Sequence, residues 1–397
     1  MLENLRSKIQ GRSGQLVVAQ SLSTLLLFAV DVVFARIFSV ELFGSWKQIL
    51  LISNFLLPLA SFGVIDGFKY FAARESSAWK EHYSSVSLLL GMMFLVLLLA
   101  NNFFDNFLFI ELLGNTELAT ISIIFPFIYI FYSLATLAKF AAINVRSEAV
   151  FKNGMIISLV LNFLVYAAVY LNYKVLSNRE ILILLALGLV MGHFVRYAYV
   201  SLKLNSYKSL RMDWSSVRGY FQYGLPLYLT SFISIIVLNT DKTIVSVYAG
   251  VTGFAIYSVG AKEIPFLGIL SSSVYQSVFP RLVEAYRNND ARKAIDLWAS
   301  STIKVSQITY PLILVLMIIS RPAVVFLYGD QYEPAVRIFQ TYLLVLFWRN
   351  NYYGALLSAS GKTNWIMLYG LLTMLVNIAL SIIFYQMFGT IGVVYGT

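Results

Sequence analysis

The chain has 397 residues, of which 59% are hydrophobic and only 12% charged, and its net charge is +10. Soluble domains carry about a quarter charged residues, so this composition excludes a water-soluble fold and indicates a protein of the lipid bilayer. There are no cysteines, which excludes thiolate metal sites, and the two histidines, His82 and His193, fit no metal-ligand motif. The basic residues lie scattered between apolar runs, so we expect neither nucleic acid nor a metal as a partner.

Eleven apolar stretches are long enough to cross a membrane, since a core of about 30 Å needs roughly 20 helical residues at about 1.5 Å each. Helices are the expected form because every backbone group must be hydrogen-bonded within lipid. The first six stretches lie near 14–38, 43–64, 84–101, 118–139, 154–172 and 180–202. The next five lie near 222–248, 252–279, 300–320, 338–359 and 364–387. Residues 389–397 resemble the start of a twelfth helix.

Loop lysines and arginines predict the orientation, because cytoplasmic loops are enriched in them. If the N-terminus is cytoplasmic, even alternation of eleven helices places most basic loop residues on the cytoplasmic side. The external connections then hold only Lys174, Arg179, Arg321 and Arg337. We therefore predict a multi-pass membrane protein with a cytoplasmic N-terminus.

The two halves of the chain resemble each other. A polar, basic turn leads into an apolar helix with one asparagine at 144–166 and again at 358–380, and these asparagines are Asn162 and Asn377. Asp31, late in the first predicted helix, has a counterpart in Asp241, late in the seventh. Six helices separate the members of each pair, so the halves point the same way through the membrane.

This duplication predicts an all-α fold of two parallel six-helix bundles around a central cavity, with the twelfth helix truncated in this sequence. We expect an N-terminal lobe over 1–203, an amphipathic cytoplasmic connector over 204–221 and a C-terminal lobe over 222–397. Substrate sites of such repeats lie near the bilayer midplane, at the repeat interface.

Short motifs in the second half resemble those of a known family. They are Tyr223-Gly224-Leu225-Pro226, Asp241-Lys242, Val251-Thr252-Gly253, Phe279-Pro280-Arg281-Leu282 and the segment 356–362. With them the chain resembles the polysaccharide biosynthesis flippases, the O-antigen (Wzx-type) branch of the multidrug/oligosaccharidyl-lipid/polysaccharide exporter superfamily. The family often has Gly where Ala255 stands, which loosens the fit at that helix.

The resemblance implies a MATE-like fold and a flippase acting by alternating access. Its substrate would be an undecaprenyl-pyrophosphate-linked oligosaccharide, an O-antigen or exopolysaccharide repeat unit, moved from the cytoplasmic to the periplasmic leaflet. The implied partners are this lipid-linked oligosaccharide, the membrane lipids, a polysaccharide polymerase and a chain-length regulator. No cofactor is implied.

Charges inside the membrane cost about 2.5–3.5 kcal/mol on insertion scales, so they are functional candidates. Arg349, near the middle of the tenth predicted helix, and Lys262, near the middle of the eighth, are the deepest cations. One alignment of the halves places Lys47 on Lys262 and another pairs Trp46 with Tyr257; the sequence leaves both open. Fixed cations would lower the barrier for a diphosphate, and arginine offers a bidentate fork. We predict a cationic substrate site of Arg349, Lys262 and Lys47, with internal ion pairs as the alternative.

Other charges in the apolar stretches have weaker claims. Four cations lie toward helix ends, where long side chains reach water by snorkelling: Arg36, Lys242, Arg196 and Lys304. Three carboxylates could couple transport to a proton or sodium ion, or form ion pairs with nearby cations: Asp31, Asp241 and Glu263.

Two other functions stay open. A cation-coupled multidrug antiporter of the same superfamily would present a mainly acidic cavity, whereas the deepest candidates here are basic. A membrane polysaccharide polymerase or ligase would need a large extramembrane loop with catalytic groups. The longest external stretch, near 102–117, holds three carboxylates but no base or nucleophile constellation. With no phosphate-binding Gly loop or catalytic triad pattern either, we predict that the chain is not an enzyme.

Overall fold

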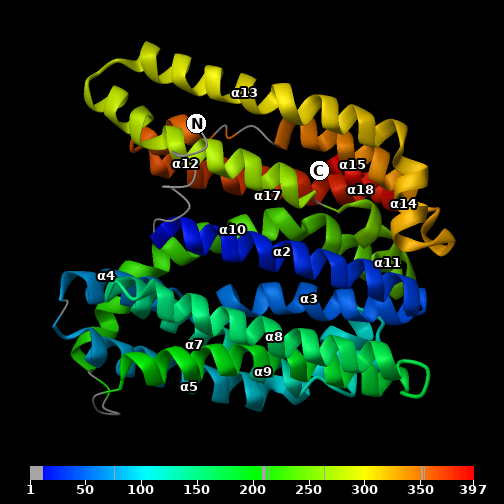
Figure 1. The fold of residues 1–397 in the computed structure, drawn as a ribbon, viewed down its shortest axis with the longest axis horizontal. Helices are drawn as coiled ribbons and strands as arrows, with labels where there is room; N and C mark the ends of the chain where they lie inside the picture. The colour runs from blue at the N-terminus through cyan, green and yellow to red at the C-terminus, as the bar shows by residue number, and fades with distance from the viewer. Residues whose placement is uncertain are drawn as a thin grey trace. The chain divides into compact units, whose positions relative to one another are not determined.

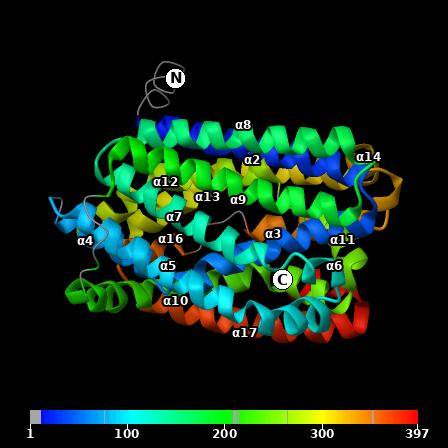
Figure 2. The same cartoon turned by 90° about the horizontal axis from the view of Figure 1, so that it is seen from below.

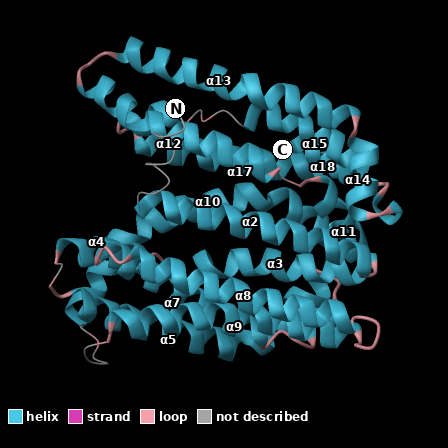
Figure 3. Cartoon of the chain, viewed as in Figure 1, coloured by secondary structure: helices cyan, strands magenta, loops and turns pink. Residues whose placement is uncertain are grey.

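The computed structural model describes residues 12–75, 77–207, 212, 214–262, 264–349, 352 and 354–397. This part of the chain consists of helices joined by short connections, and none of it lies in a β-strand (Figure 3). Seven of its helices are long and apolar enough to cross a membrane, at 79–101, 124–144, 148–172, 178–204, 216–248, 291–318 and 365–388. The prediction of an all-α, polytopic membrane protein is confirmed.

The chain divides into two compact units, Met1–Ile235 and Ile236–Thr397. The long helix α10 (Trp214–Tyr248) carries the chain from the first unit into the second (Figure 1). The predicted cytoplasmic connector, 204–221, therefore ends within the first turns of α10, which belong to unit 1. Pro226 lies inside this helix, and it leaves one helical hydrogen bond unmade there.

Unit 1 is a bundle whose long helices pack side by side. Before α10 its elements are α2 (Arg12–Ile37), α3 (Val40–Ser61), α4 (Val64–Arg74), α5 (Trp79–Phe104), the π-helical η1 (Asp105–Leu112), α6 (Thr116–Ala119), α7 (Ile124–Asn144), α8 (Glu148–Asn172) and α9 (Asn178–Leu204). Helix α8 packs against α2 and α9, and α7 packs against α5 and α9 (Figure 2).

The second predicted membrane stretch, 43–64, corresponds to α3, and the chain turns at its end before α4 begins. Phe62 and Gly63 both have positive φ, at 42° and 78°. The turn brings the Gly63 backbone against that of Gly224 in α10. A Cβ on Gly63 would lie 2.3 Å from the Gly224 carbonyl oxygen, and a Cβ on Gly224 would lie 2.0 Å from that of Gly63. Only glycine fits at either position.

Helix α4 follows this turn and carries Lys69 and Arg74. An apolar face with helical spacing holds it against unit 1: Val64, Phe68 and Ala72 are completely buried against α5 and α7.

Unit 2 has the same kind of architecture. After α10 its elements are α11 (Gly250–Gly260), α12 (Pro265–Arg287), α13 (Ala291–Ile318), α14 (Ser320–Tyr328), the 3-10 turn η2 (Asp330–Tyr332), α15 (Ala335–Arg349), α16 (Ala355–Ala359), α17 (Thr363–Phe388) and α18 (Thr390–Gly396). Helix α12 packs against α13, α11 against α15, and α17 against α18.

Two stretches of unit 2 that were predicted as continuous helices are interrupted, and those predictions are wrong. The stretch 252–279 divides into α11 and α12, because Pro265 has no N–H and forces extended backbone on Ile264, with φ −83° and ψ 112°. The stretch 338–359 divides into α15 and α16, and Tyr352 between them is not helical. The sequence at this second interruption contains two asparagines at 350–351 and Gly354, residue types with low helix propensity.

Candidate functional site

In unit 1, the predicted cation Lys47 forms an ion pair with the predicted carboxylate Asp31. Ser39 caps α3 by accepting a hydrogen bond from the Leu42 N–H, which starts the helix and sets its register. Lys47 Nζ then lies 2.5 Å from Asp31 Oδ2 on α2, and each side chain is only 10% exposed. The buried ring of Tyr166 on α8 lies within electrostatic range of Asp31. The two predicted residues therefore occur together, as the ion-pair alternative expected.

Unit 2 contains a matching arrangement. The Tyr257 hydroxyl on α11 donates to Asp241 Oδ2 on α10 at 3.0 Å. Asp31 and Lys47 are 16 residues apart, and so are Asp241 and Tyr257. The structure therefore places Tyr257 at the position equivalent to Lys47, and it supports neither alignment that the sequence left open.

The asparagine pair of the repeat also has equivalent surroundings in the two units. On α8, the Asn162 side chain packs directly against Gly192 of α9. On α17, Asn377 Nδ2 donates to the Gly396 carbonyl of α18 at 3.3 Å. In both units the asparagine of one helix meets a glycine of the next helix, which supports the internal duplication.

Arg349 lies at the end of α15 and not in the middle of a helix, so that detail of the prediction is wrong. Its Nη1 donates to the Tyr342 hydroxyl at 2.8 Å, and the Tyr342 side chain is completely buried. Both residues lie within electrostatic range of the Tyr257 hydroxyl that binds Asp241. Arg349 thus belongs to a buried polar network that extends from α15 through α11 to α10. Sequence reasoning missed Tyr257 and Tyr342, because their spacings from Asp241 and Arg349 identify no partner before the packing of the helices is known.

Lys262 lies in the non-helical segment between α11 and α12. The prediction placed it near the middle of one helix, which is wrong, because Pro265 ends the helical pattern there. Glu263, predicted beside it, lies outside the described residues. Arg349 and Lys262 therefore share a feature: each lies where a membrane stretch of unit 2 is interrupted.

Interrupted helices have a chemical consequence in a membrane. Each interruption leaves backbone N–H and C=O groups without helical partners, and lipid cannot satisfy them. Such segments occur where they are buried in protein or line a water-filled cavity, and in transporters they bind charged substrate groups. A guanidinium and an ammonium at two such positions can bind the oxygens of an anion.

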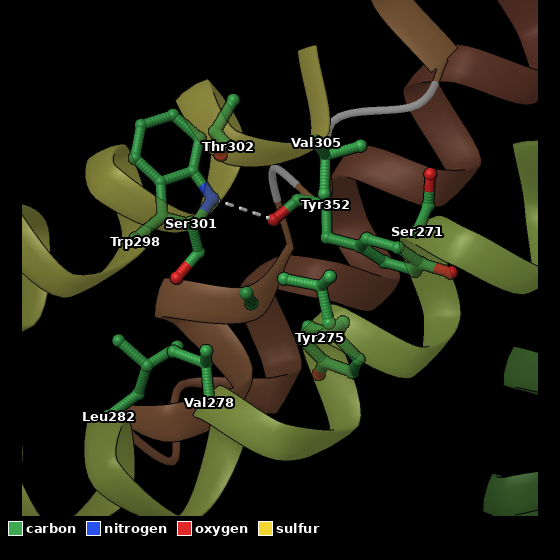
Figure 4. Close-up of a pocket in the computed structure, with 11 residues that line it drawn as sticks. Ser271, Tyr275, Val278, Leu282, Trp298, Ser301, Thr302, Val305 and Tyr352 are labelled. Carbon is green, nitrogen blue, oxygen red and sulfur yellow. Dashed lines mark hydrogen bonds between the residues drawn. The ribbon is translucent and has the colours of Figure 1, made fainter. Parts of the chain in front are cut away.

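A small hollow in unit 2 lies between α12, α13 and the segment before α16 (Figure 4). Trp298 Nε1 donates to the Tyr352 carbonyl oxygen at 3.0 Å, and the Tyr275 and Tyr352 rings stack with centroids 4.6 Å apart. The buried Ser271 hydroxyl also lines the hollow, and it has no hydrogen-bond partner among the described residues. With a volume of about 30 Å³ the hollow can admit one or two water molecules but no sugar ring.

A larger groove in unit 1 runs between α2 and α8. Its volume is about 320 Å³, and apolar side chains such as Val30 and Phe163 line most of it. Two polar atoms, the Asn162 Oδ1 and the Tyr166 hydroxyl, belong to residues of the groove, and neither has a hydrogen-bond partner among the described residues. The groove is of a size and polarity that suit a hydrocarbon chain.

A family model described as "Polysaccharide biosynthesis protein" matches residues 33–337, which include Lys47, Asp241 and Lys262. The chain belongs to this family. The family resemblance predicted from the short motifs is thereby confirmed. No curated protein matches the chain in sequence.

Solved structures show which fold this family member has. An inward-facing multidrug resistance MATE family transporter of the MOP superfamily is 15% identical, with a TM-score of 0.71 over 94% of this chain and 90% of that one. Lipid II flippase MurJ, in an inward closed conformation, is 19% identical, with a TM-score of 0.71 over 96% of this chain and 83% of that one. A MOP superfamily transporter from Pyrococcus furiosus is 13% identical, with a TM-score of 0.57 over 96% of this chain and 90% of that one. The MATE-like fold predicted for this family member is confirmed.

Proposed function

We propose that the chain is a flippase that moves an oligosaccharide on an undecaprenyl-pyrophosphate carrier from the cytoplasmic to the periplasmic leaflet by alternating access. The family match over 33–337 is the main support for this proposal, because the family is described by polysaccharide biosynthesis and the chain is a multi-pass membrane protein. One protein with the same fold is described as a lipid II flippase, which supports the transport of a lipid-linked sugar. The same two observations support a role in transport.

The basic residues supply the physical reason for an anionic substrate. Moving a diphosphate through the low-dielectric membrane is unfavourable unless fixed cations and hydrogen-bond donors replace its water. Arg349 and Lys262 lie at interrupted helices, and transporters use such interruptions to bind charged substrate groups. We propose that these two residues bind the diphosphate. Lys47 has a weaker claim, because its ammonium group is already bound to Asp31.

The substrate also needs a place for its hydrocarbon chain. The groove between α2 and α8 has an apolar surface, and a hydrocarbon chain is more stable against such a surface than in water. We propose that part of the carrier chain, or a membrane lipid in its absence, lies in this groove. A polysaccharide polymerase and a chain-length regulator are proposed as partners that receive the translocated repeat unit.

A deletion strain tests the function. Without the chain, lipid-linked repeat units should accumulate on the cytoplasmic side and surface glycan should disappear. Arg349→Ala should reproduce this phenotype while the protein still inserts at normal level. Arg337→Ala is the matched control, because Arg337 is an exposed residue of the same helix. Unchanged surface glycan with no accumulated intermediate in the deletion strain would rule out the flippase.

A cation-coupled multidrug antiporter is the second candidate, since a structural neighbour is a multidrug transporter. It would need free carboxylates, yet the Asp31 and Asp241 side chains bind Lys47 and Tyr257. Drug susceptibility of the deletion strain separates the two functions, because loss of a drug antiporter makes cells sensitive without any change in their glycan.

We also propose an inner-membrane location with the N-terminus in the cytoplasm. Reporter fusions at residue 176, in the α8–α9 loop, and at residue 207, after α9, would test the orientation. The first position should report the periplasm and the second the cytoplasm.

A further inference from the structure

Three basic side chains of unit 1, none of them part of the proposed substrate site, come together. Lys69 comes from α4, Lys139 from α7 and Arg196 from α9. The Lys69 and Lys139 ammonium groups lie against the same ring, with Nζ 4.0 Å and 5.7 Å from the centroid of Phe140. Lys139 is within electrostatic range of both Lys69 and Arg196. We call Lys69, Lys139 and Arg196 the basic cluster.

The described carboxylates around the basic cluster do not neutralise its positive charge. Asp66 binds Lys69 at 2.5 Å, and it lies on α4 beside that lysine. Among the described residues, no carboxylate is paired with Lys139 or Arg196. The other groups near Arg196 are neutral or basic, namely the Tyr132 hydroxyl on α7 and the His193 imidazole on α9. Three cations therefore face one carboxylate.

Arg196 shows the shortage of acceptors most clearly. Its Nη2 donates to the Ser158 hydroxyl on α8 at 3.4 Å, near the upper limit for a hydrogen bond. Its Nε is buried and has no acceptor in the described part of the chain. A guanidinium stays charged and has five N–H donors, so one long bond to a neutral hydroxyl leaves most of its capacity unused. Snorkelling, which the sequence suggested for Arg196, does not account for a buried Nε.

We propose that the basic cluster binds the phosphate group of a lipid. A phosphate has the two features that the cluster lacks, negative charge and several acceptor oxygens, and the Arg196 fork can bind two of those oxygens at once. Membrane lipids are the molecules that bring phosphate to a membrane-embedded unit. The phosphate can belong to an anionic phospholipid or to a polyprenyl diphosphate, and the test separates these sources. The site is independent of the proposed substrate site.

Lipid retention measures the site directly. The full chain is purified in detergent, supplied with either phosphatidylglycerol or a polyprenyl diphosphate, and analysed by native mass spectrometry. Arg196→Gln and Lys139→Gln should each lower retention about tenfold, because each removes a charge-assisted hydrogen bond to phosphate. Arg179→Gln is the matched control, since Arg179 is an exposed residue on the same helix as Arg196, and it should leave retention unchanged.

The retention of the two lipids identifies the ligand of the basic cluster. Lower retention of the polyprenyl diphosphate alone identifies the carrier as the ligand, and lower retention of both lipids identifies a general phosphate site. Equal retention of both lipids by Arg196→Gln and the parent would overturn the proposal. Should Arg196→Gln fail to fold, Arg196→Lys keeps the charge without the fork and should still weaken binding of the polyprenyl diphosphate. The assay measures binding and not export, so its failure leaves the flippase proposal untouched.

Thermal stability without lipid is an independent measurement. Removing a partly buried charge that has no paired carboxylate should not destabilise the protein, so Arg196→Met should melt at or above the parent temperature in detergent alone. A melting temperature several degrees lower, together with normal lipid retention, would show that Arg196 has only a structural role.

Discussion

Substitutions at the Asp31–Lys47 ion pair test how much the pair contributes to the stability of unit 1. Each side chain is only 10% exposed, so the pair lies close to the buried limit, where loss of one partner costs about 3–5 kcal/mol. Asp31→Asn and Lys47→Met should each approach that loss, because each leaves one charge buried and unpaired. The double variant should regain most of the lost stability, since neutral side chains of similar size replace both charges.

Thermal unfolding in lipid nanodiscs, followed by tryptophan fluorescence, measures this cycle. For a unit of this size about 1 kcal/mol corresponds to roughly 2–4 °C, so a loss of about 3 kcal/mol should lower the melting temperature by roughly 6–12 °C. Arg321→Met is the control, because the Arg321–Glu333 pair is 73% and 53% exposed and should contribute less than about 1 kcal/mol. Single variants that melt like the parent, or a double variant that melts as low as the single variants, would contradict the stabilising role of the ion pair.

The same double variant tests the role of Lys47 in transport. A stable double variant without glycan export would show that Lys47 or Asp31 acts in transport itself, beyond holding α2 against α3. Normal export would show that the pair only holds α2 against α3, and the predicted substrate role of Lys47 would then be wrong.

Three further substitutions test the fold of each unit. Gly224→Ala should destabilise unit 1 by about 1–3 kcal/mol in thermal unfolding, because its Cβ would overlap the Gly63 backbone, whereas Gly91→Ala in open space should be neutral or slightly stabilising; equal effects would contradict the contact. Tyr257→Phe should cost about 0.5–1.5 kcal/mol in the same assay, because it removes the hydrogen bond to the Asp241 carboxylate; no loss would contradict the hydrogen bond. Pro265→Ala should lengthen the helices on either side of Lys262 and lower glycan export, and unchanged export would show that the interruption is not needed for transport.

Patterns along the chain predicted the features that depend on local composition. Apolar length predicted spans of which seven coincide with helices long and apolar enough to cross a membrane. The paired positions of Asp31 with Asp241 and of Asn162 with Asn377 predicted an internal duplication. In the structure each aspartate binds a side chain 16 residues further along the chain, a lysine in one unit and a tyrosine in the other, and each asparagine meets a glycine of the next helix.

Features that depend on single residues or on distant contacts were missed. A hydropathy window averages over about 20 residues, so Pro265 did not break the apolar pattern that it interrupts in the structure. The partners of Lys47 and Arg349 are 16 and 7 residues away, and neither spacing identifies a partner before the packing of the helices is known. The distance of Arg196 from a helix end predicts snorkelling, but this distance does not show how far α7 and α8 bury the side chain.

The interruption at Lys262 has a consequence for chemical labelling. Backbone groups that no helix satisfies need water, so the segment between α11 and α12 should exchange its amide hydrogens faster than the helices on both sides. A cysteine introduced at Lys262 should react with a small water-soluble maleimide, although its position lies within an apolar stretch. Because the chain has no cysteine of its own, such a label would report on this one position, and its rate would follow the opening of the protein to either side of the membrane.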